Sequence, residues 1–177
     1  MYEVELKVEA DHDAVRARLD ELGATHDGRV QQVDTYYDAP HRNFAETDEA
    51  FRLRREHDEA GETAKLTYKG PLVEVESKTR EEHEVEVDDG EEAAAIADGL
   101  GFTPAATVEK DREFYRLDGY TVTLDSVEGL GTYVEVETEV ETDIEPAREG
   151  AKELLRRLDL DPDEQVRTSY LGLLLAS

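Results

Sequence analysis

MYEVELKVEA, residues 1–10, is the stretch that decides the fold. Apolar and charged side chains alternate along it: Tyr2, Val4, Leu6 and Val8 against Glu3, Glu5, Lys7 and Glu9. Successive side chains of a β-strand point to opposite faces, so the alternation predicts a strand with one apolar and one charged face. The apolar face needs a hydrophobic layer to cover it, and the charged face carries both signs.

Seven more strands are predicted where β-branched and aromatic residues lie between Gly, Pro and Asp turns, at residues 29–38, 50–56, 63–69, 79–87, 107–117, 121–127 and 132–140. Helical spacing predicts helices from the Asp11 cap to Gly23 and at residues 91–100, 146–158 and 163–175. So few helices between strands argue against a parallel βαβ sheet. We expect an α+β fold with an antiparallel sheet, open or closed, helices packed outside, and a single domain over residues 1–177.

The composition limits the classes of function. With 46 acidic and 20 basic residues the net charge is −26, which should repel nucleic acids and anionic membrane surfaces. The chain has no Cys, so a disulfide framework and a thiolate zinc site are excluded. It shows neither a signal-peptide pattern nor an apolar run long enough to span a membrane, so we expect a cytoplasmic location. An acidic composition with only six Lys is typical of halophilic proteins.

The scarce cations lie on the predicted strands. Pairs at even spacing occur at Arg52 and Arg54, Lys65 and Lys69, and Lys110 and Arg112. The face that carries them could simply be solvated, with cross-strand ion pairs each contributing a few tenths of a kcal/mol. On so acidic a surface, however, mostly Asp and Glu would be expected. The alternative is a charged interior in which the cations neutralise a polyphosphate.

Carboxylates alternate on two strands, at Glu3 and Glu5 and again at Glu135, Glu137 and Glu139. Hard oxygen donors suit Mg²⁺ or Mn²⁺. Alternate residues of a strand are about 6.5 Å apart, so neighbouring strands would have to share one ion. Closing the sheet into a barrel would bring such strands together.

The chain resembles the CYTH, or triphosphate tunnel metalloenzyme, superfamily. Residues 2–7 contain the Glu-x-Glu-x-Lys signature of that superfamily, and the likeness continues in order through residues 32–38, 52–54, 66–71, 78–82, 110–112, 124–131, 135–137 and 169–171. The Leu-Asp-x-Val-x-x-Leu-Gly block at residues 124–131, with the following Glu-x-Glu, is most similar to the class IV adenylyl cyclase branch. One departure is that some bacterial class IV cyclases carry a His-Phe pair before the first Glu, where this chain has Met1 and Tyr2.

The resemblance implies a closed antiparallel barrel of about eight strands that forms a charged tunnel. It implies that Glu3, Glu5, Glu135 and Glu137 hold Mg²⁺ or Mn²⁺. It also implies triphosphate binding by Lys7, Arg52, Arg54, Lys69, Lys78, Arg80, Lys110 and Arg112. The same carry-over gives the catalytic set Lys7, Arg52, Lys69, Lys110 and Asp125.

Three functions remain open at this point. The first is an adenylyl cyclase of class IV type that converts ATP to cyclic AMP and pyrophosphate. The second is a triphosphatase acting on thiamine triphosphate, inorganic tripolyphosphate or a nucleoside triphosphate, and the third is a non-catalytic polyphosphate or nucleotide sensor. The expected partner is thus a small-molecule triphosphate, and a homodimer is possible. The apolar run at residues 170–175 is expected to pack on the outside of the barrel rather than to form a dimer surface.

Overall fold

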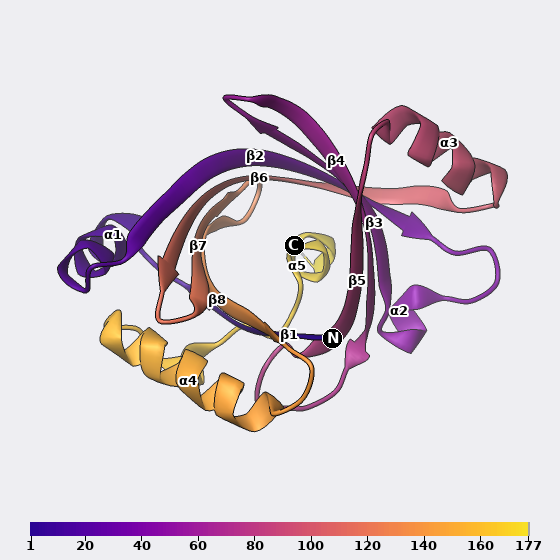
Figure 1. Cartoon of the computed structure of the whole chain (residues 1–177). Helices are drawn as coiled ribbons and strands as arrows, with labels where there is room; N and C mark the ends of the chain where they lie inside the picture. The colour runs from indigo at the N-terminus through magenta and orange to yellow at the C-terminus, as the bar shows by residue number, and fades with distance from the viewer. Residues whose placement is uncertain (177) are drawn as a thin grey trace.

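The computed structural model describes residues 1–176, whose eight strands form one closed antiparallel barrel (Figure 1). In chain order the strands are β1 (Tyr2–Glu9), β2 (Thr25–Asp38), β3 (Ala50–Asp58), β4 (Gly61–Leu72), β5 (Arg80–Val87), β6 (Thr103–Leu117), β7 (Tyr120–Val127) and β8 (Gly131–Val140). The helices are α1 (His12–Glu21), α2 (Phe44–Thr47), α3 (Gly90–Gly99), α4 (Ile144–Arg157), the 3₁₀ turn η1 (Pro162–Glu164) and α5 (Tyr170–Ala176). The predicted α+β fold with a closed barrel is confirmed.

The first strand closes the barrel. The strand order around the wall is β1-β5-β4-β3-β2-β6-β7-β8, and β1 pairs with β8 along its whole length, from Tyr2 opposite Val140 to Glu9 opposite Tyr133. The register sets Glu5 opposite Glu137 and Lys7 opposite Glu135. Charged residues of the two terminal strands therefore share one face.

Both faces of β1 are buried. On the outer face Leu6 and Val8 pack with Val15 and Leu19 of α1 and with Leu155 of α4, in a cluster that also includes side chains of β7 and β8. On the inner face Lys7 is fully buried and Glu5 is 3% exposed. The main hydrophobic core thus lies between the barrel and the helices, and the interior is left to charged side chains.

The last helix is shorter than predicted, and four of its residues line the cavity inside the barrel. In place of a helix over residues 163–175, the chain forms η1, an extended segment and then α5. The hydroxyl of Tyr170, the first residue of α5, donates to Asp125 on the inner face of β7, and its side chain is 5% exposed. The expectation that this run packs against the outside of the barrel wall is therefore wrong, because Tyr170 points inward and Leu171 and Leu175 also line the interior cavity.

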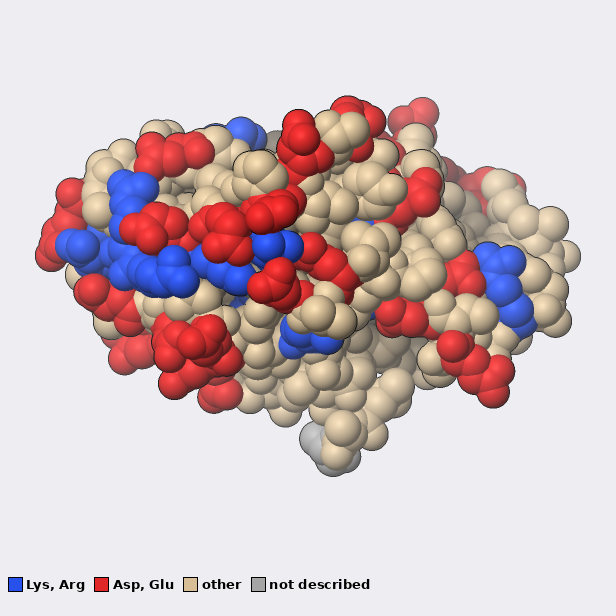
Figure 2. Space-filling model, turned by 90° about the horizontal axis from the view of Figure 1, so that it is seen from below, with Lys and Arg blue, Asp and Glu red and all other residues tan. Residues whose placement is uncertain are grey.

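Cations of α4 form ion pairs with acidic neighbours. Figure 2 shows one face on which acidic side chains are spread widely and Lys and Arg gather in a few groups among them. On α4, Arg148 contacts Glu74 at 2.7 Å, Lys152 contacts Glu149 at 3.2 Å and Arg156 contacts Glu153 at 3.3 Å. No helix of the described residues is both long and apolar enough to cross a membrane.

Candidate active site in the barrel

A cavity of about 690 Å³ occupies the barrel interior, within the range usual for small-molecule sites. Eight basic side chains line it: Arg52, Arg54, Lys65, Lys69, Lys78, Arg80, Lys110 and Arg112. Eleven acidic side chains also line it, among them Glu3, Glu5, Glu135 and Glu137. If all were ionised, the lining would carry an excess of three negative charges. A triphosphate could therefore enter favourably only with additional cations.

Two arginines are fixed by buried aspartates. Arg54 donates to both oxygens of Asp34 at 2.7 Å each, and Arg112 donates to both oxygens of Asp125 at 2.6 and 2.9 Å. Both aspartates are fully buried. A bidentate contact fixes the plane of a guanidinium group and leaves its other N–H groups free to bind an anion.

Arg52 has a buried donor that is left unused. It lies 3.9 Å from Asp34 and 3.8 Å from Glu84, and its buried Nε has no hydrogen-bond partner. Donors in such surroundings cost free energy unless an acceptor arrives. The Nε–H of Arg52 is thus available to donate to a phosphate oxygen.

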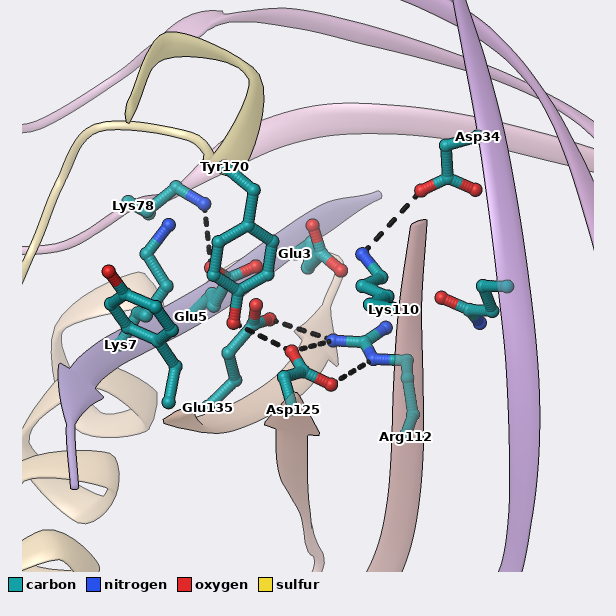
Figure 3. Close-up of polar contacts among 12 residues, drawn as sticks. Glu3, Glu5, Lys7, Asp34, Lys78, Lys110, Arg112, Asp125, Glu135 and Tyr170 are labelled. Atoms are coloured by element: carbon teal, nitrogen blue, oxygen red, sulfur yellow. Dashed lines mark hydrogen bonds and ion pairs between the residues drawn. The ribbon is translucent and has the colours of Figure 1, made fainter. Parts of the chain in front are cut away.

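Three carboxylates converge beside the cations. Oxygens of Glu3, Glu5 and Glu137 lie within 4.8 Å of one another. Two lysines partly compensate their negative charges: Lys69 contacts Glu3 and Lys78 contacts Glu5, both at 2.7 Å (Figure 3 shows the Lys78 contact). This donor set fits a hard divalent cation such as Mg²⁺ or Mn²⁺. It also places such an ion directly beside two phosphate-binding candidates.

The carboxylates titrate abnormally. Burial and then the negative charge of Glu3 raise the pKa of Glu137 well above its usual range. Burial raises the pKa of Glu82 to about 7, and the nearby Glu3 carboxylate adds to the effect although Lys69 opposes it. Burial opposes ionisation of Glu3 as well, yet Lys69 holds its pKa well below the usual value. Like charges crowded in a low-dielectric site produce this divergence.

Two buried lysines hold their protons weakly. Burial, followed by repulsion from Arg112 and Arg54, lowers the pKa of Lys110 to about 7, although Asp34 lies 3.5 Å away. Burial and the neighbouring Lys78 lower the pKa of Lys7 to about 8. An arriving polyanion would stabilise the charged forms of both.

Four predicted site residues differ from their expected placement. Glu135 is not in the carboxylate cluster; its Oε2 lies 3.2 Å from Arg112 instead. Arg80 lines the cavity, but its guanidinium donates to the carbonyls of Asp48 and Gly70. Lys7 and Asp125 do not line the cavity, because Tyr170 contacts them from the inside (Figure 3). The remaining predicted residues lie around one cavity.

Sequence reasoning missed three residues of this interior. Asp34 occupies an inward-facing position of β2, opposite Arg54 of β3, and its carboxylate accepts a hydrogen bond from Arg54. Glu82 lies 3.1 Å from Lys69 and shares that cation with Glu3. Tyr170 reaches in from α5. Alternation could have indicated Asp34 and Glu82, whereas nothing in the sequence pattern points Tyr170 inward.

Comparisons with known proteins agree with this architecture. A model of the CYTH domain matches residues 1–170. "Putative adenylate cyclase MJ0240" of Methanocaldococcus jannaschii is 38% identical over 176 residues, 98% of each chain. The solved structure of the PH1819 protein from Pyrococcus horikoshii OT3 is 40% identical, covers 98% of each chain and superposes with a TM-score of 0.91. The Hippeastrum protein HpAC1 has the same fold at 21% identity, with a TM-score of 0.72 over 99% of this chain and 95% of its own.

Proposed function

Because the chain belongs to the CYTH domain family, we propose that its barrel binds ATP with a divalent cation and converts it to cyclic AMP and pyrophosphate. The observation that supports this most strongly is the convergence of eight Lys and Arg side chains with the Glu3, Glu5 and Glu137 cluster on one cavity. Relatives of this chain carry adenylate cyclase names. An uncharged substrate would not need such an interior.

Glu3, Glu5 and Glu137 would hold the cation, Mg²⁺ or Mn²⁺. A divalent ion so placed supplies charge neutralisation and polarises phosphate oxygens. It would also offset the negative excess of the cavity lining. Lys69 contacts Glu3 of the cluster, and the charge of Arg52, whose Nε has no partner, also acts on Glu3. Both cations would bind the phosphates that leave as pyrophosphate.

The chain's own cations would orient the substrate. Arg54 and Arg112 present fixed guanidinium planes because their aspartates hold them, which lowers the entropy cost of binding a triphosphate. Holding the triphosphate curled would bring the ribose 3′-hydroxyl in line with the α-phosphorus. Donors positioned before the reaction stabilise the charge that develops on the departing pyrophosphate.

A triphosphatase is the second candidate. Met1 and Tyr2 stand before Glu3, where some bacterial class IV cyclases carry a His-Phe pair. HpAC1 is described as a "putative adenylyl cyclase" with "a dominant triphosphatase activity". The same cations would then present the terminal phosphorus to water. The bond from that phosphorus to the bridging oxygen would break, which releases orthophosphate and the corresponding diphosphate.

Product analysis separates the two reactions. The purified protein is incubated in molar KCl with Mg²⁺ or Mn²⁺ and ATP, thiamine triphosphate or tripolyphosphate, and the products are separated by chromatography. Cyclic AMP with pyrophosphate supports the cyclase, and orthophosphate without cyclic nucleotide supports the triphosphatase. Arg52→Met should abolish turnover, whereas Arg116→Met, at a surface pair whose Arg side chain is 69% exposed, should not. No turnover of any of the three substrates would refute both.

A further inference from the structure

We propose that Tyr170 is a positioning residue of the triphosphate site, which holds Arg112 and Lys110 in place from the C-terminal segment. The inference rests on the proposed function and adds a residue to it. Tyr170 lines the cavity and also contacts the charged residues Asp125 and Lys7 behind it. Leu171 and Leu175 of the same helix also line the cavity.

The first contact acts through Asp125. The Tyr170 hydroxyl donates to Oδ2 of Asp125 at 2.7 Å, the same oxygen that accepts from Arg112 at 2.9 Å (Figure 3). Burial raises the pKa of Tyr170 well above its ordinary value, so the hydroxyl remains a donor. Asp125 therefore has two fixed partners, and the orientation of Arg112 depends on both.

The second contact is made by the ring. The ring centroid lies 5.0 Å from Nζ of Lys110, which lines the cavity, and 4.1 Å from Nζ of Lys7, which does not. Ammonium groups within about 6 Å of an aromatic face are attracted to it. The ring limits how far Lys110 can swing toward this end of the barrel.

Lys7 anchors the segment that carries Tyr170. Its Nζ donates to the carbonyl of Thr168 at 2.6 Å, and its own carbonyl accepts from the backbone N–H of Val166 at 2.7 Å. Lys7 is fully buried. In this arrangement its ammonium serves the C-terminal segment, and the phosphate contacts fall to Lys110 and Arg112.

Two substitutions separate the hydroxyl from the ring. Tyr170→Phe keeps the ring against the lysines and removes the hydrogen bond to Asp125, and Tyr170→Leu removes both. Tyr120→Phe is the matched control, because the Tyr120 hydroxyl donates to the carbonyl of Ala147 at 2.8 Å, away from the cavity. Binding of inorganic tripolyphosphate is measured by calorimetry with Mg²⁺, and KM and kcat are measured for the substrate that the wild type converts.

The expected Kd for tripolyphosphate rises about tenfold in Tyr170→Phe, as for loss of a hydrogen bond to a charged group, and further in Tyr170→Leu. KM should rise more than kcat falls, and Tyr120→Phe should match the wild type. A Tyr170→Leu Kd within twofold of the wild-type value overturns the inference, even if its melting temperature falls. A wild type that does not bind tripolyphosphate overturns this inference, whereas turnover of ATP in the product analysis would leave the proposed function standing.

Acetylation of the lysines gives a readout that does not depend on turnover. The protein is treated briefly with acetic anhydride, and the modification of Lys7 and Lys110 is quantified by mass spectrometry against exposed amines. Both lysines should react faster in Tyr170→Leu than in Tyr170→Phe, wild type or Tyr120→Phe. Equal protection in all four proteins contradicts a role of the Tyr170 ring in holding these lysines.

Discussion

Asp34 stands among three cations, and Asp34→Asn should destabilise the barrel strongly. Asp34 is fully buried, accepts two 2.7 Å hydrogen bonds from Arg54, and lies 3.5 Å from Lys110 and 3.9 Å from Arg52. Removing one partner of a buried ion pair costs about 3–5 kcal/mol. Asn keeps one acceptor oxygen, so we expect about 3 kcal/mol. In a chain of this size that lowers the melting temperature by roughly 6–12 °C.

Thermal unfolding followed by circular dichroism at pH 7 measures the effect. Asp118→Asn is the control, because Asp118 pairs with Arg157 at the surface, where both side chains are more than a third exposed, and should change stability by less than about 1 kcal/mol. Tripolyphosphate should narrow the gap between Asp34→Asn and the wild type, since it returns negative charge to the same cations. A melting temperature for Asp34→Asn equal to that of Asp118→Asn would refute the reasoning.

The pH dependence has a definite sign. Burial alone would raise the pKa of Asp34, but the neighbouring Arg54 guanidinium outweighs it and holds that pKa far below its usual range. A depressed folded-state pKa contributes stability that is fully present above the unfolded-state pKa, near 4, and is lost as the pH falls below it. The wild type should therefore lose stability below about pH 4 more steeply than Asp34→Asn.

Three further predictions concern charge. Lys110 has a pKa of about 7, so binding of tripolyphosphate at pH 8 should be accompanied by uptake of a proton. The uptake is measured as a calorimetric binding enthalpy that varies with the ionisation enthalpy of the buffer. Lys110→Arg should reduce this variation, and an unchanged variation would contradict the assignment of the proton to Lys110. Glu137→Gln should weaken Mn²⁺ binding at least tenfold without unfolding the protein. Glu139→Gln should leave the affinity for Mn²⁺ unchanged. Equal Mn²⁺ affinities of the two variants would refute the metal site. With a net charge of −26, dilution from molar to millimolar KCl should lower the melting temperature, and an unchanged value would remove the halophilic interpretation.

The sequence alone predicted the strands well but could not orient them. Alternation in β1 separates Leu6 from Lys7, yet a period of two is the same whichever face points inward. The charge pattern left a solvated face and a charged interior equally open, and the family resemblance favoured the interior. The barrel and its eight strands confirm that choice, and helices α1 and α4 cover the apolar face.

What the sequence could not supply was register and tertiary contact. Glu135 and Glu137 are equivalent in the pattern, but the pairing sets Glu137 opposite Glu5 and Glu135 opposite Lys7, within reach of Arg112. The predicted helix over residues 163–175 has a sound start at Pro162, but Lys7 binds the segment after η1 through Val166 and Thr168. Contacts between residues this distant in sequence leave no local signal.

The most direct test of the central claim is a crystal structure with Mn²⁺ and a non-hydrolysable ATP analogue, with the metal located by its anomalous signal. The account predicts a Mn²⁺ peak between Glu3, Glu5 and Glu137, and a triphosphate chain inside the barrel against Arg52, Lys69 and Lys110. A triphosphate bound outside the barrel, or a metal peak away from these three carboxylates, would contradict it.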